Sequence, residues 1–229
     1  MKKWMKLLML AVLPFALASC ENDDDDNDVM LNDANVMVVH ASPNAPGVDL
    51  LINNTKVNTT PLTYPNNTEY LAVPAGTQNI KVNAAGTSTT VIDANVELDP
   101  DAAYSVFAIN TLANIEPLVL EDDLTEPAAN MAHVRFAHLS PDAPAVDVAV
   151  QGGPVLFSNR SFKSATDFTP VPAGTYTLEV RPAGSMDVVL TVPDVVLSNG
   201  GIYTIFAKGF LTPPAGNMNT LGAEIIVND

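Results

Sequence analysis

The chain carries one sequence motif twice at an almost constant spacing, and this repeat constrains its fold more than any other feature. HASPNAPGVD at 40–49 returns as HLSPDAPAVD at 138–147, an offset of 98 residues between the two histidines. Two further patterns return in the same order: VPAGT at 73–77 and 171–175, and Tyr-x-Val/Ile-Phe-Ala at 104–108 and 203–207. Three ordered matches at nearly one spacing predict two copies of a single domain.

Each copy is predicted to consist of short strands separated by turns. Runs rich in β-branched and aromatic residues alternate with Pro, Gly, Asn and Asp. In the second copy Tyr176, Leu178 and Val180 alternate with polar residues, which is the period of a half-buried strand. The strands expected in the first copy are 36–40, 48–52, 70–73, 78–83, 91–98, 104–110 and 118–121. Those expected in the second copy are 133–138, 146–150, 168–171, 176–181, 188–197, 202–208 and 224–227.

About seven strands in about 100 residues, without helical periodicity, are typical of an immunoglobulin-like sandwich. The prediction is therefore an all-β protein of two tandem immunoglobulin-like β-sandwich domains. A small barrel is the alternative, because the number of strands does not decide whether a sheet closes. The predicted division is a signal peptide at 1–19, a tether at 20–32, sandwiches at 33–122 and 132–229, and a linker at 123–131.

The first twenty residues have the layout of a secretory signal. Three lysines precede an apolar run at 7–17, and the small residues Ala18 and Ser19 lead up to Cys20. The apolar run is shorter than the roughly 20 residues that a helix needs to cross a membrane, which disfavours the alternative of an uncleaved anchor. Leu-Ala-Ser-Cys at 17–20 resembles the lipobox of bacterial lipoproteins. That resemblance implies cleavage between Ser19 and Cys20, followed by lipidation of the cysteine.

Cys20 is the only cysteine, so the exported domains cannot form an internal disulfide. The acidic run at 21–28 is expected to stay extended and solvated, because dense like charges repel one another. It lacks the glycine turn and the ligand spacing of an EF-hand calcium loop. The run also resembles the surface-export signal of Bacteroidetes lipoproteins, which implies an outer-membrane lipoprotein displayed on the cell surface.

The charge of the chain excludes one class of partner. The formal net charge is −16, and loss of the signal with Lys2, Lys3 and Lys6 takes it to −19. Such an acidic protein repels the phosphates of nucleic acids, so nucleic-acid binding is not expected. The expected partners are the membrane, through the lipid on Cys20, and a protein or glycan of unknown identity.

VRFAHLSPDAPAVDV at 134–148, the Val-Pro-Ala-Gly-Thr turn and the Tyr-x-Val/Ile-Phe-Ala strand resemble the domain of unknown function 4397. The likeness covers almost everything after residue 33, twice. The first copy departs from it in having Met37-Val38-Val39 where the second has Arg135-Phe136-Ala137, and Asn44 in place of Asp142. The resemblance implies a secreted or surface β-domain and brings no catalytic residue with it.

The repeated motif contains the residues that most invite a catalytic interpretation. On a strand, His40 and Ser42 would share a face, and Asp49 follows them, as in a Ser-His-Asp arrangement. The sequence has no Gly-x-Ser-x-Gly elbow, however, and Ser-Pro-Asx-Ala-Pro is typical of turns. We therefore expect no catalytic residue and predict that the motif braces a turn through His40, Ser42, Pro43, Asp49, His138, Ser140, Pro141 and Asp147.

Each motif offers one histidine and one aspartate, which is fewer ligands than a zinc site requires, so neither a metal nor another cofactor is expected. The function predicted from the sequence is that of a lipid-anchored binding, adhesion or spacer module without enzymatic activity. Two alternatives remain. One is a glycan-binding component of a nutrient-uptake assembly, and the other is a hydrolase that uses His40/Ser42 and His138/Ser140.

Overall fold

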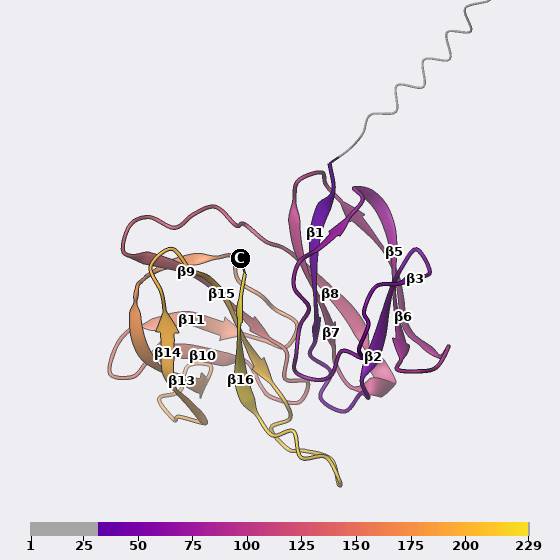
Figure 1. Ribbon diagram of the computed structural model, residues 1–229. Coiled ribbons are helices and arrows are strands. Elements are labelled where there is room, and N and C mark those ends of the chain that lie inside the picture. Colours follow the sequence, from indigo (N-terminus) through magenta and orange to yellow (C-terminus); the bar gives the residue numbers. More distant parts are fainter. Residues whose placement is uncertain (1–31, 229) are drawn as a thin grey trace, which may run out of the picture. The chain divides into compact units, whose positions relative to one another are not determined.

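The structure is a computed structural model that describes residues 32–228 (Figure 1). Within that range the chain forms sixteen strands and one 3-10 turn, η1 (Leu112–Asn114), so the all-β prediction is confirmed. No helix in this range is long and apolar enough to cross a membrane. The predicted signal peptide, Ser19, Cys20 and the acidic tether lie outside the described residues.

The first eight strands form a sandwich of two four-stranded sheets. One sheet has the order β4 (Leu71–Val73), β1 (Ala34–His40), β7 (Ala103–Ile109), β8 (Glu116–Glu121). The other has the order β3 (Thr55–Lys56), β2 (Val48–Ile52), β5 (Gly76–Ala84), β6 (Thr90–Leu98). Neighbouring strands are antiparallel except for β1 and β7, which are parallel. Val36, Val38 and Val106 lie in the core of this sandwich.

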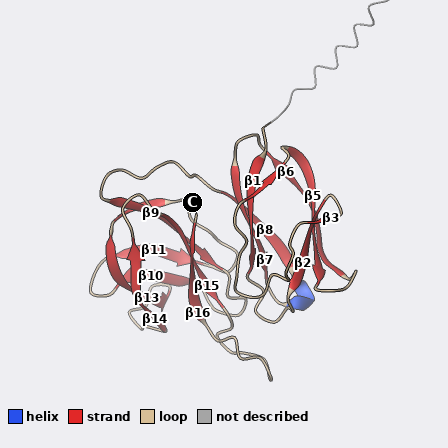
Figure 2. Ribbon diagram, viewed as in Figure 1, coloured by secondary structure: helices blue, strands red, loops and turns tan. Residues whose placement is uncertain are grey.

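The last eight strands form a second sandwich (Figure 2). They repeat the order and pairing of the first eight. One sheet has the order β12 (Thr169–Pro172), β9 (Met131–His138), β15 (Ile202–Lys208), β16 (Gly222–Val227). The other has the order β11 (Val155–Arg160), β10 (Val146–Val150), β13 (Gly174–Pro182), β14 (Leu190–Leu197). Strands β9 and β15 are parallel, like their counterparts. All four sheets are open, with edge strands, so the sandwich prediction holds and the alternative of a small barrel is wrong.

Each sandwich has one strand more than the seven that the sequence indicates. The additional strand in the first copy is β3, which follows β2 after a tight turn through Asn53 and Asn54. Both asparagines have positive φ, 49° and 64°, as a two-residue hairpin turn requires. The additional strand in the second copy, β11, has three apolar residues followed by three polar ones and buries only Phe157. Because β3 has only two residues and β11 has its apolar residues in one block, neither edge strand shows the hydrophobic alternation that reveals the others.

Strands β1 and β7 are buried along both faces, because a third core lies outside the two sandwiches. Side chains of β1 alternate between the first core, which takes Val36 and Val38, and the third core, which takes Met37 and Val39. The equivalent phenylalanines of the two copies, Phe107 and Phe206, meet there with ring centroids 5.9 Å apart at an interplanar angle of 75°. The two copies therefore bury the same sheet face against each other. They are connected by this shared interface as well as by the short linker that the sequence indicates.

Candidate functional site

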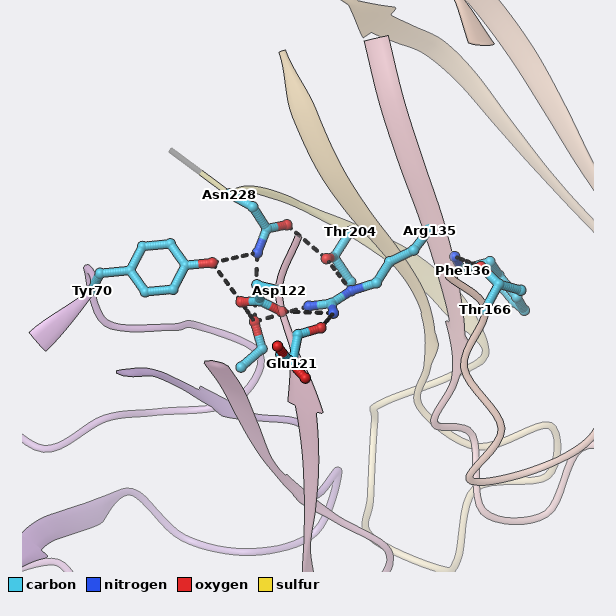
Figure 3. A network of polar contacts seen from close by, with 9 residues as sticks. Tyr70, Glu121, Asp122, Arg135, Phe136, Thr166, Thr204 and Asn228 are labelled. Atoms are coloured by element: carbon cyan, nitrogen blue, oxygen red, sulfur yellow. Dashed lines mark hydrogen bonds and ion pairs between the residues drawn. The ribbon is translucent and has the colours of Figure 1, made fainter. Parts of the chain in front are cut away.

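Among residues 32–228 the most buried cation is Arg135 in β9, which pairs with Asp122, the residue that follows β8 (Figure 3). Arg135 Nη1 lies 2.6 Å from Asp122 Oδ1. The two residues are only 2% and 5% exposed. Because Asp122 ends the first sandwich and Arg135 belongs to the second, the ion pair joins the two copies at their shared interface.

Hydrogen bonds use the remaining polar atoms of this pair. The guanidinium donates from Nε to Thr204 Oγ1 (2.8 Å), from Nη2 to Ser105 Oγ (2.9 Å) and from Nη1 to the Glu121 carbonyl (3.3 Å). Asp122 Oδ2 accepts from the Tyr70 hydroxyl (2.5 Å) and from Ser105 Oγ (2.7 Å). Asp122 Oδ1 has the ion pair with Arg135 as its contact. Such a connected network holds its members in one arrangement, because a buried donor or acceptor that loses its partner is costly.

Asn228 completes the network from the end of β16. Its Nδ2 donates to the Tyr70 hydroxyl at 3.0 Å, and its Oδ1 accepts from Thr204 Oγ1 at 2.7 Å. Asn228 is the structural counterpart of Asp122, because the backbone N–H of each donates to the first residue of the neighbouring strand. Asp122 donates to the Ala103 carbonyl in β7, and Asn228 donates to the Ile202 carbonyl in β15. The network is thus built from equivalent positions of the two copies that carry different side chains.

Burial and charge shift the ionisation of two members of the network. Burial raises the pKa of the Tyr70 hydroxyl well above its usual range, and the nearby Asp122 carboxylate raises it further. Burial also lowers the pKa of Arg135, while the attraction of Asp122 acts in the opposite direction. Tyr70 is therefore a neutral donor at physiological pH, and Arg135 retains its charge because its ordinary pKa lies above 12.

Arg135 also lines a cleft of about 450 Å³ at the junction of the two copies. Its guanidinium carbon lies 4.6 Å from the centroid of the Phe168 ring, which lines the same cleft. The remaining lining residues come from β8 and the segment after it, and from the loop before β12: Val119, Leu120, Glu121, Asp123, Ala165, Thr166 and Asp167. The acidic residues Glu121, Asp123 and Asp167 are exposed. The cleft therefore has one lining side chain, Arg135, that is held in place by the buried network, and acidic side chains at its rim.

The histidines of the repeated motif are fully buried at the ends of β1 and β9. Nε2 of His40 lies 2.9 Å from the Pro46 carbonyl, and Nε2 of His138 lies 3.0 Å from the Pro144 carbonyl. In both rings Nδ1 has no hydrogen-bond partner among the described residues. Burial lowers the pKa of both imidazoles. Each histidine therefore closes its own Pro-containing turn in the neutral form.

The serines and aspartates of the motif form no hydrogen bond with these histidines. Ser42 Oγ donates to the Asn110 carbonyl at 2.7 Å, whereas Ser140 Oγ has no partner within residues 32–228. Asp49 pairs with Lys56 at 2.8 Å and accepts the Gly86 N–H at 3.0 Å. Its pKa is lowered, chiefly by Lys56. In this arrangement Asp49 joins strand β3 to the turn between β5 and β6, and it does not contribute to the turn that the histidine closes.

Asp147 accepts two backbone N–H groups, from Asn159 at 2.7 Å and from Gly184 at 2.9 Å. These bonds lower its pKa. The Asx residue inside the motif also reaches further than a local turn: Asn44 accepts the Leu112 N–H, and Asp142 accepts those of Leu211 and Thr212. The motif therefore forms hydrogen bonds to loops that are distant in sequence. The expected local turn chemistry does not include these bonds.

The structure does not assemble the Ser-His-Asp arrangement. His40 and Ser42 each bond to a backbone carbonyl instead of to one another, at distances of 2.9 and 2.7 Å. Pro43 has a separate contact, since its carbonyl accepts from Asn217 Nδ2 at 3.0 Å and from Asn219 Nδ2 at 2.6 Å. Its counterpart Pro141 lies in the equivalent turn after β9. In the described part of the chain, no three His, Cys, Asp or Glu side chains are grouped in a way that could hold a metal.

The sequence does not indicate a site at the junction residues, although it contains one signal of it. Arg135 interrupts the apolar run at 134–137, at the position where the first copy has Met37. A cation within a strand of consecutive buried residues requires a buried partner. The sequence alone does not identify that partner, because the acidic residues around 121–126 all look equally solvated.

Fold and site together define a tandem β-sandwich protein whose two copies are joined by a buried ion pair beside a cleft. The chain belongs to the family described as domain of unknown function (DUF4397), whose profile matches residues 34–149. No curated protein matches the sequence. Among solved structures, a family 26 carbohydrate-binding module of Amy13K from Eubacterium rectale, in complex with maltoheptaose, shares 8% identity at a TM-score of 0.29. The match covers 85% of this chain and 97% of the module, but a score this low informs neither its fold nor its ligand.

Proposed function

We propose that the mature protein is a lipid-anchored binding module of the outer-membrane surface, and that the cleft beside Arg135 is where it binds a partner. In this proposal Cys20 carries the lipid and the acidic run at 21–28 serves as the tether. The strands from β9 to β16 form a second copy of the same family domain. This assignment rests on the sequence repeat and on the identical strand order of the two copies.

The observation that carries the proposal is the coupling of the cleft to the buried network. Binding sites work best when their walls are held by packed and hydrogen-bonded neighbours. Here Arg135 and Glu121 line the cleft and also belong to the network around Asp122. A volume of about 450 Å³ lies within the usual range of ligand pockets. The site is therefore already formed before a ligand arrives.

The geometry of the motif favours binding over hydrolysis. A serine nucleophile needs a histidine within hydrogen-bonding distance as its base. The Ser42 hydroxyl donates to the Asn110 carbonyl, and His40 contacts the Pro46 carbonyl. Both groups thus stabilise loops, which leaves the junction cleft as the better candidate for function.

The anchoring part of the proposal is tested by Cys20→Ser in the full chain. We expect the wild-type protein to incorporate labelled palmitate and to fractionate with the outer membrane. The variant should be unlabelled and should leave the membrane fraction. A variant that stays with the outer membrane without label would show that attachment does not depend on Cys20.

The binding part is tested with the mature chain on arrays of glycans and of peptides. Asp167→Trp blocks the mouth of the cleft, and Glu69→Trp places the same bulk at the matching exposed position of the first copy. We expect a partner that Asp167→Trp loses and Glu69→Trp retains. Equal retention by both variants, for any glycan or peptide that the wild type binds, would place the binding surface elsewhere.

A further inference from the structure

We propose that the occupant of the junction cleft is an extended peptide segment that adds a strand to the free edge of β8 and places a basic side chain at the acidic rim. This inference rests on the proposed function and names the chemistry of its partner. It follows from three features of the cleft. Within residues 32–228, backbone groups of β8 are unpaired, only part of the β8 edge is open, and the negative charge of the rim has no compensating cation.

The register of β8 decides which of its backbone groups face the cleft. Asp122 N–H bonds to Ala103 O, so Asp122 faces β7. In an antiparallel pair, alternate residues face the partner strand, so Leu118 and Leu120 also point their backbone groups to β7. Val119 and Glu121 therefore point theirs outward, and both residues line the cleft.

The outward groups are nearly free of partners. The Glu121 carbonyl accepts a long hydrogen bond of 3.3 Å from Arg135, which confirms its outward direction. The N–H and C=O of Val119 form no hydrogen bond with any residue between 32 and 228. A free edge with this donor and acceptor pair is a template for another strand.

The first half of the same edge is protected. Pro117 occupies an outward position and has no N–H to offer. Beside it, Lys163 of the second copy forms a 2.7 Å ion pair with Glu116. Protection of one half of the strand confines an added strand to the part from Val119 to Glu121, which spans about three residues.

The charge of the cleft selects the kind of peptide. Glu121, Asp123 and Asp167 are exposed at its rim. The only cation in the lining, Arg135, is already neutralised by Asp122 at 2.6 Å. Complementary charge therefore requires lysine or arginine on the partner segment.

The test uses the mature wild-type chain and two pools of capped pentapeptides. One pool has lysine at its second and fourth positions and any residue elsewhere, and the other has glutamate at those positions. Val119→Pro removes one of the two outward donors of β8, the Val119 N–H, without touching the ladder to β7. Ile225→Pro is its matched control, since Ile225 holds the equivalent outward position in β16. Circular dichroism and thermal unfolding establish that both variants are folded.

We expect the wild type and Ile225→Pro to retain peptides of the lysine pool, and Val119→Pro to bind these peptides at least tenfold more weakly. None of the proteins should retain peptides of the glutamate pool. Retained peptides that are N-methylated at every second amide provide a second measurement. One of the two methylation registers should abolish binding, because those amides would donate to β8. This readout applies even if Val119→Pro does not fold.

Equal binding of the lysine pool by Val119→Pro, or by both methylated forms, would overturn the inference. If no peptide is retained while a glycan is bound and then lost in Asp167→Trp, the cleft remains the binding site and only the peptide inference fails. If neither arrays nor pools yield a ligand that depends on the cleft, the proposed function fails as well.

Discussion

Arg135 and Met37 occupy equivalent positions in the two copies, yet only the arginine carries a charge, which it places 2.6 Å from Asp122 at the shared interface. Asp122 in turn is the counterpart of Asn228, which is neutral. Both members of the ion pair thus lie where the two copies differ. The pair makes an otherwise pseudo-symmetric interface directional, so that one copy supplies the cation and the other the anion.

The repeat itself supplies the substitutions that test this pair. Arg135→Met and Asp122→Asn each introduce the residue that the other copy has. Either change alone leaves a buried charge without its partner, and we expect each to lower the free energy of unfolding by about 3 kcal/mol. The double variant removes both charges and should lose clearly less than the sum of the single losses. Urea unfolding of the four proteins gives the coupling energy directly. Additive losses would mean that the pair contributes nothing beyond its separate hydrogen bonds.

The buried histidines predict loss of stability in mild acid. Burial lowers the pKa of His40 and His138, so the folded state keeps them neutral where the unfolded chain, with a pKa of about 6.5, binds protons. The stabilisation is complete above about pH 6.5 and falls as the pH decreases, with a slope of at most about 1.4 kcal/mol per pH unit for each histidine. We expect the free energy of unfolding, measured by urea titration between pH 5 and 7, to show this slope. The double variant His40→Gln/His138→Gln should show a flatter one. An unchanged slope in the double variant would assign the acid sensitivity to other groups.

Two glycines with similar positive φ should respond very differently to alanine. Gly209 and Gly216 have φ of +77° and +82°. A Cβ at 209 would lie 2.1 Å from the Thr220 carbonyl oxygen, whereas one at 216 would meet nothing within 4 Å. Gly216→Ala should cost about 1 kcal/mol, from conformation alone, and Gly209→Ala clearly more, because the 209–221 loop must also move. Similar thermal unfolding temperatures for the two variants would contradict this packing.

The sequence was sufficient to predict the sandwiches because repeat, alternation and turn residues agree with one another. It could not predict how the copies meet. The apolar run of β1 indicates a strand that is covered on both faces, but many different surfaces could cover it. The pairing of Arg135 with Asp122 was hidden for a related reason: Asp122 begins an acidic, linker-like segment whose residues look alike until the fold buries one of them.

Turn chemistry was also predictable only in part. The contact of His40 with the Pro46 carbonyl stays within the motif, six residues apart. Asn44 instead reaches Leu112, which is 68 residues away. A short polar side chain that can bond to a local amide can equally bond to a distant one, and only the tertiary fold decides between the two.

Photo-crosslinking in intact cells is the most direct test of the claim that the junction cleft is the binding surface. A photoreactive phenylalanine analogue is placed in the full lipidated chain, at Asp167 in one strain and at the matching Glu69 in another. We expect a defined adduct from position 167, with a peptide of the partner attached to it, and no such adduct from position 69. Adducts of equal yield from both positions, or from position 69 alone, would contradict this claim.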